Sequence, residues 1–131
     1  MSMIDLSAYK KLYVQTAGQY CESILKSCHK LLQNPKDKNA LQNIYISAHS
    51  IRSQSQVMGY CQTEQLSGMI EKVAKNFLGE GKAIPKDLIN VTAEAVKAII
   101  ASLKNIEAIN QERDTGSIAK KLEDAYSKFF L

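Results

Sequence analysis

The sequence lacks several features, and each absence excludes a class of protein. No apolar stretch of the 131-residue chain approaches the roughly 20 residues that a membrane-spanning helix needs, since Lys97 interrupts even the richest run, residues 93–103. Residues 1–5 lack the basic start and apolar centre of a secretory signal. Neither a Gly-rich nucleotide loop nor a cluster of metal ligands is present. We therefore expect a soluble, cytoplasmic protein with no membrane contact, no cofactor and no metal of its own.

Cysteine is scarce, and the three that occur are Cys21, Cys28 and Cys61. Cys21 and Cys28 lie two turns apart on one predicted helix, roughly 10 Å by the helical rise, which is too far for a disulfide. We expect all three to be reduced thiols in the core. Cys28 next to His29 could form a pair of metal ligands, but the sequence has no second pair at ligand spacing.

The chain has an excess of positive charge that is not clustered in any one segment. The formal net charge is +4 and the pI is about 8.9. The lysines are scattered along every segment, and no aromatic-basic interleaving or helix-turn-helix pattern accompanies them. This pattern favours a solvated surface over nucleic-acid binding.

The sequence shows helical periodicity in five segments, and no segment has the alternating pattern of a strand. The predicted helices are residues 6–33, 39–58, 63–77 with Thr63 as cap, 85–110 and 117–130. Asn34-Pro35, Gly59 and Gly79-Glu80-Gly81 separate the first four. The inward-facing sets include Tyr9 in the first helix and Phe129 in the fifth. Because short connections favour antiparallel neighbours, we predict one all-α domain, residues 1–131, folded as an antiparallel up-and-down four-helix bundle with an additional C-terminal fifth helix.

The second helix carries a candidate site beside its buried stripe. Apolar and small residues recur at steps of three and four, namely Leu41, Ile44, Ala48, Ile51, Ser55 and Met58. The adjoining stripe contains Tyr45, His49, Arg52 and Gln56. A titratable imidazole and a permanent cation therefore share an accessible face. Small residues near them, Ser50, Ser53, Ser55 and Gly59, permit close approach by another protein.

Glu71 is the predicted partner of His49. In a hairpin that turns near Gly59, Glu71 lies about as far beyond the turn as His49 lies before it. A carboxylate that accepts a hydrogen bond from one ring nitrogen fixes the tautomer and leaves the other nitrogen as a nucleophile. The alternatives are a structural histidine, and a solvated Glu71 paired with Lys72 or Lys75.

At these residues the sequence resembles a histidine-containing phosphotransfer domain, specifically the amino-terminal domain of chemotaxis histidine kinases of the CheA type. The resemblance rests on Ala48-His49-Ser50-Ile51-Arg52-Ser53, followed by Gly59, Leu66 and Glu71. It covers almost the whole chain, including the extra fifth helix. It implies that His49 is the phosphoacceptor, that Glu71 orients the imidazole and that Arg52 neutralises phosphate charge. We place receiver docking at Tyr45, Ser53, Gln56 and Gly59.

The resemblance implies a phosphorelay carrier, and we expect the isolated domain to be a monomer. His49 accepts a phosphoryl group from the ATP-binding domain of a histidine kinase, in the same or another chain, and passes it to an aspartate of a response-regulator receiver. ATP and magnesium are expected on the partner domains. Arg52 replaces the usual lysine, Ser53 the usual glycine, and Gly68 a second histidine of some relatives. Ser53 keeps open the alternative of an interaction module that docks partners without efficient phosphotransfer. A plain helical scaffold is a third reading, and the sequence leaves open whether the chain is free-standing or part of a larger kinase.

Overall fold

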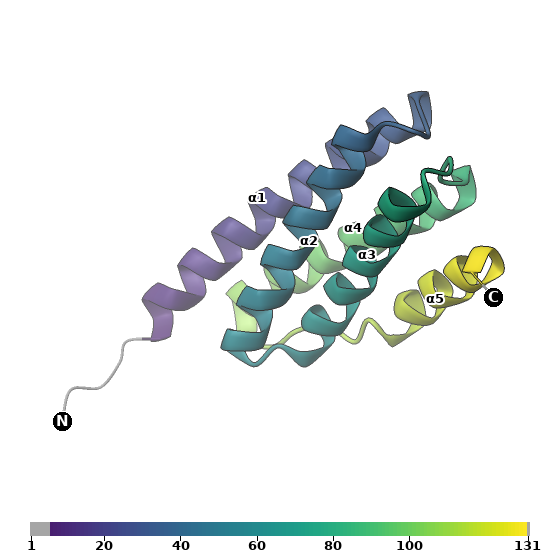
Figure 1. The fold of residues 1–131 in the computed structure, drawn as a ribbon. Helices are drawn as coiled ribbons and strands as arrows, with labels where there is room; N and C mark the ends of the chain where they lie inside the picture. Colours follow the sequence, from purple (N-terminus) through teal and green to yellow (C-terminus); the bar gives the residue numbers. More distant parts are fainter. Residues whose placement is uncertain (1–5, 131) are drawn as a thin grey trace.

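All five predicted helices are present in the computed structural model, which describes residues 6–130 (Figure 1). They are α1 (Leu6–Gln33), α2 (Lys38–Met58), α3 (Cys61–Glu80), α4 (Lys86–Ile109) and α5 (Gly116–Phe130). No strand occurs among these residues. None of the helices in the described part of the chain is long and apolar enough to cross a membrane.

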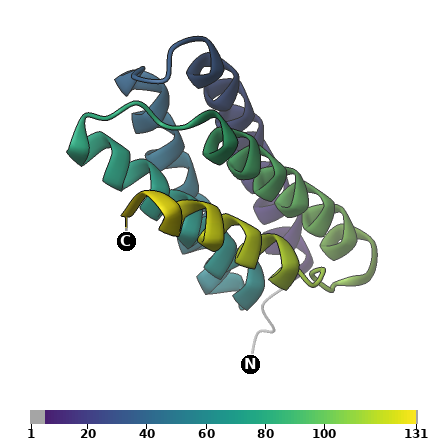
Figure 2. The same cartoon turned by 90° about the vertical axis from the view of Figure 1, so that its right-hand side faces the viewer.

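The first four helices form a bundle in which each runs antiparallel to the next (Figure 1). α2 packs between α1 and α3, α4 closes the ring against α1 and α3, and α5 lies along α3 and α4 (Figure 2). Each bundle helix contributes a fully buried isoleucine, Ile24, Ile51, Ile70 and Ile99, and α5 contributes Leu122. Burying a large aliphatic side chain stabilises the fold by roughly 1.5–3 kcal/mol. The predicted four-helix bundle with a fifth helix is confirmed.

The ends of α2 follow from local chemistry. The Asp37 side chain accepts a hydrogen bond from the Ala40 amide at 3.1 Å and so satisfies one of the free amides in the first turn. At the other end Gly59 has φ of 80°, a left-handed conformation that glycine adopts without steric cost. α2 therefore ends at Met58, and the hairpin to α3 begins where the sequence predicts it.

The start of α3 differs from the prediction. Thr63 does not cap this helix, because α3 begins two residues earlier, after Tyr60. The free amides of Gln62 and Thr63 instead donate to the carboxylate of Glu112, at 2.9 and 3.2 Å, and the Thr63 hydroxyl donates to it at 3.0 Å. The cap thus comes from the connection between α4 and α5, and it fastens that connection to the hairpin.

Replacing Glu112 with alanine should lower the free energy of unfolding by about 1–2 kcal/mol, because two helix amides and a buried hydroxyl lose their acceptor. Urea denaturation measures this change. The control is Glu107→Ala on the exposed side of α4, for which we expect a change within about 0.5 kcal/mol. Equal stability of the two variants would show that Glu112 is not a functional cap.

Three side chains lie outside the core that the sequence predicts for them. Tyr9 is 56% exposed, because it stands on the wall of an open groove between α1 and α2. Phe129 is 44% exposed in the last turn of α5, beyond the buried Leu122. Cys61 is exposed at the start of α3, whereas Cys21 and Cys28 are buried thiols whose pKa is raised by that burial to about 12.

Candidate functional site

His49 lies on the outer side of α2, midway along the helix. Its neighbours Ala48 and Ile51 are fully buried, and they fix the rotation of α2 about its axis. His49 is one position away from Ala48, so its side chain is 52% exposed although the helix itself is firmly packed. A packed helix thus presents the imidazole ring to solvent.

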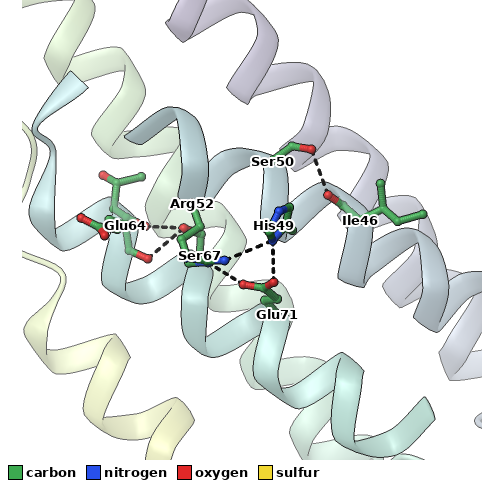
Figure 3. A network of polar contacts seen from close by, with 8 residues as sticks. Ile46, His49, Ser50, Arg52, Glu64, Ser67 and Glu71 are labelled. Carbon is green, nitrogen blue, oxygen red and sulfur yellow. Dashed lines mark hydrogen bonds and ion pairs between the residues drawn. The ribbon is translucent and has the colours of Figure 1, made fainter. Parts of the chain in front are cut away.

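Glu71 on α3 and Arg52 on α2 complete a three-residue network around this ring (Figure 3). The Nδ1 atom of His49 lies 2.7 Å from Oε2 of Glu71. The Nε atom of Arg52 donates to Oε1 of the same carboxylate at 2.6 Å, and its Nη2 atom lies 3.1 Å from Nδ1. Both carboxylate oxygens are therefore engaged, one by each partner on α2.

The hairpin brings these side chains together as the sequence predicts. Glu71 is only 13% exposed and lies against α2. Within residues 6–130 its ion pairs are with His49 and Arg52, and not with Lys72 or Lys75 of its own helix. The solvated-charge alternative for Glu71 is therefore wrong.

The charge of Glu71 determines which nitrogen of His49 carries the proton. Burial alone would raise the pKa of the Glu71 carboxyl, but hydrogen bonds from Arg52 and His49 outweigh it and lower the pKa below its ordinary value. An ionised carboxylate can only accept hydrogen bonds. The nitrogen that faces it at 2.7 Å, Nδ1, must therefore be the protonated one. In the neutral ring the lone pair is then on Nε2, at the opposite edge of the ring.

Arg52 is partly exposed, and its guanidinium is directed at Glu71. The Nε bond to Glu71 raises the pKa of the guanidinium, so the side chain keeps its charge. Its hydrogen bond in the network is the one to the carboxylate, since Nη2 and the protonated Nδ1 of His49 are both donors and only lie near each other. Arg52 thus lies at the Nδ1 edge of the ring and not at the Nε2 edge. This placement gives Arg52 a role in holding Glu71 that the sequence does not reveal.

Three of the four predicted docking residues lie on α2, and Gly59 is the residue that ends this helix. The Tyr45 ring is partly buried, with its centroid 6.4 Å from that of the His49 ring. Gln56 and Gly59 are exposed near the end of the helix. Ser53 is partly buried and lines the groove between α1 and α2.

That groove is the feature that sequence reasoning missed. It has a volume of about 350 Å³, and its walls are mainly apolar. The residues that give it this character include Tyr9, Leu12, Tyr13, Val57 and Met58. Val57 is 86% exposed and Leu12 is 57% exposed. The available signal is that both are apolar residues outside the buried stripes of their helices, and the structure shows that they line one groove together.

The described residues do not bring together any three His, Cys, Asp or Glu side chains in the way that a metal site requires. Within the network, the candidate nucleophile is the Nε2 atom of His49, because Nδ1 is bonded to Glu71 and both carboxylate oxygens of Glu71 accept hydrogen bonds. When the His49 ring is uncharged, this arrangement can offer the Nε2 lone pair to an electrophile, with the Glu71 carboxylate on the opposite edge of the ring.

Comparison with known proteins supports the resemblance. No protein-family model matches the sequence. The chain is 19% identical over 121 residues to the chemotaxis protein CheA of Bacillus subtilis (strain 168), which covers 92% of this chain but only 18% of that protein. The chain thus spans less than a fifth of the length of that relative.

A solved structure shows the same fold. The phosphorylated P1 domain of CheA3 from R. sphaeroides, crystallised in complex with CheY6, superposes with a TM-score of 0.84 at 14% sequence identity. The match covers 93% of this chain and 98% of that one. The predicted resemblance to a CheA-type phosphotransfer domain is confirmed, and the fold of this chain is that of the P1 domain.

Proposed function

We propose that this chain is a histidine phosphotransfer domain of a chemotaxis-type signalling system, with His49 as the phosphoryl carrier. The observation that carries the proposal is the half-exposed His49 ring whose Nδ1 is held by the ionised Glu71. The fold shared with the P1 domain of CheA3 supports it. The kinase domain, with its ATP and magnesium, acts in the same or another chain.

The reaction has two displacements at phosphorus. In the first, the Nε2 lone pair attacks the γ-phosphorus of ATP, the bond to the bridging oxygen breaks, and its electrons leave with ADP. In the second, a carboxylate oxygen of a receiver aspartate attacks the same phosphorus, and the P–N bond electrons return to Nε2. The Nδ1 proton stays on His49 throughout.

Glu71 stabilises the phosphorylated ring as well as orienting it. Once both ring nitrogens are substituted, the imidazole carries positive charge. The carboxylate 2.7 Å from Nδ1 lies beside that charge in a partly buried position, where electrostatic stabilisation is stronger than in open water. Arg52 keeps Glu71 ionised. Because it lies at the Nδ1 edge of the ring, it offsets phosphate charge on Nε2 only from a distance and without a direct contact in this arrangement.

The proposal is tested by incubating the chain with the kinase core of a CheA-type protein and ATP labelled on the γ-phosphate. We expect a label that is acid-labile and alkali-stable, as a phosphohistidine is. Phosphoramidate, a small phosphoryl donor that releases ammonia, gives a second route independent of any kinase. If the chain takes no label from either donor, the carrier function is excluded.

We place the receiver over the predicted docking residues and the adjoining apolar groove. Ser53 lies one helical turn from His49 and also lines this groove, so the groove begins beside the acceptor ring. An apolar surface next to a charged site suits a partner that must dock and then exchange a charged group. The P1 domain of CheA3 is itself in complex with the receiver CheY6.

Replacing Val57 with aspartate should slow phosphoryl transfer to a CheY-type receiver by about tenfold, because a charge enters the apolar docking surface. The rate is measured as loss of label from the pre-phosphorylated chain. Labelling by phosphoramidate should stay unchanged, since Val57 is not part of the His49 network. Leu32→Asp, an exposed apolar position in the last turn of α1, is the matched control. Transfer from Val57→Asp at the unmodified rate would place docking elsewhere.

A further inference from the structure

Gly68 lies in the middle of α3, where glycine is not required by the backbone. The glycines with positive φ in the described chain are Gly59 and Gly81, so Gly68 has an ordinary helical conformation. Glycine inside a helix is less stable than alanine, because it loses more conformational freedom on folding. The reason for glycine at this position must therefore lie in its surroundings.

Those surroundings are the side chain of Arg52. A Cβ atom at Gly68 would lie 3.1 Å from Cδ of Arg52 and 4.0 Å from its Cγ. The first of these distances is shorter than normal van der Waals contact. The aliphatic part of Arg52 therefore occupies the space that any other residue at position 68 would fill.

The position of that aliphatic part decides where the guanidinium lies. Gly68 and Glu71 are three residues apart and share one face of α3. Arg52 crosses α3 over Gly68 and reaches Glu71 with its Nε at 2.6 Å, while Nη2 lies 3.1 Å from Nδ1 of His49. Because Cδ and Nε are directly bonded to each other, a shift of Cδ over Gly68 also moves the Nε that donates to Glu71.

We propose that Gly68 is a positioning residue for phosphoryl acceptance: its missing side chain lets Arg52 lie across α3 and hold the Glu71 carboxylate against Nδ1 of His49. The inference rests on the proposed function, and it adds to the His49 site a residue that has no side chain. A methyl group at position 68 displaces Cδ of Arg52 by a few tenths of an ångström. The Nε bond to Glu71 then lengthens, and the carboxylate is free to turn away from the ring.

The test compares Gly68→Ala with Gly18→Ala. Gly18 is also inside a helix, has no positive φ, and would have nothing within 4 Å of an added Cβ. We expect both variants to fold, and Gly18→Ala to have a raised melting temperature with an unchanged site. In Gly68→Ala we expect the ¹⁵N chemical shifts of the His49 ring to move toward those of a mixture of tautomers. We also expect phosphorylation by phosphoramidate to slow by about three- to tenfold, because small misplacements of reacting groups have large effects on rate.

A double-mutant cycle separates this role from a general effect on packing. With Arg52→Ala the side chain that Gly68 accommodates is absent, so adding Gly68→Ala should cause no further loss of rate. Losses that multiply in the double variant would overturn the proposal, as would unmodified ring shifts in Gly68→Ala. The ring shifts are measured without any donor, so they test Gly68 even if the unmodified chain takes no label, a result that would instead overturn the proposed function.

Discussion

Replacing His49 with glutamine should abolish phosphoryl acceptance while leaving the fold intact. Glutamine keeps a polar side chain of similar reach but has no ring nitrogen that can form a stable P–N bond. The His49 side chain is half exposed and is not part of the core, so its replacement should leave the fold intact and lower the free energy of unfolding by about 1 kcal/mol or less, through its hydrogen bond to Glu71. Label from ATP or from phosphoramidate should fall to background.

The chain contains a natural control for this variant. His29 is its other histidine, and it lies exposed on α1, away from the Glu71 network. His29→Gln should be labelled at the rate of the unmodified chain. If label persists in His49→Gln and disappears in His29→Gln, the phosphoacceptor is His29 on α1, and the assignment of His49 is wrong.

Replacing Glu71 with glutamine should slow phosphorylation by about 100-fold. This is at the lower end of the rate enhancement that a positioned acid or base contributes. The amide keeps the size of the carboxylate and can still accept from Nδ1, but it carries no charge to stabilise the phosphorylated ring. It also no longer forms an ion pair with Arg52. The initial rate with phosphoramidate measures the effect directly on the chain.

Stability separates this catalytic effect from damage to the fold. Glu71 is 13% exposed and holds two charge-assisted hydrogen bonds, so its loss should lower the free energy of unfolding by about 1–2 kcal/mol. Glu80→Gln, near the end of the same helix, should change neither rate nor stability. If Glu71→Gln reacts at the unmodified rate, the orienting role of Glu71 is excluded.

The sequence predicted those parts of the molecule that depend on local periodicity. The buried stripe of α2 follows from residues three and four apart, and it determines that His49 lies beside the core. The contact between His49 and Glu71 was predicted from their distances to the turn, because His49 stands ten residues before Gly59 and Glu71 twelve residues after it. Two helices joined by a tight turn pair such positions directly.

The features that escaped prediction depend on contacts between distant parts of the chain. Glu112 caps α3 from 49 and 50 residues away, which no local pattern encodes. The position of Arg52 depends on the space above Gly68, and side-chain direction across a helix pair is not a property of either sequence segment alone. The groove exists because α1 and α2 leave Tyr9, Leu12 and Val57 uncovered together.

The central claim is that phosphoryl transfer takes place at Nε2 of His49, with the proton held on Nδ1 by Glu71. The most direct measurement is ¹⁵N and ³¹P NMR of the chain labelled with ¹⁵N in its histidine rings, before and after phosphorylation. The account predicts a protonated Nδ1 in the free chain and a phosphorus–nitrogen coupling to Nε2 of His49 in the phosphorylated one. Coupling to Nδ1, or to a ring nitrogen of His29, would contradict it.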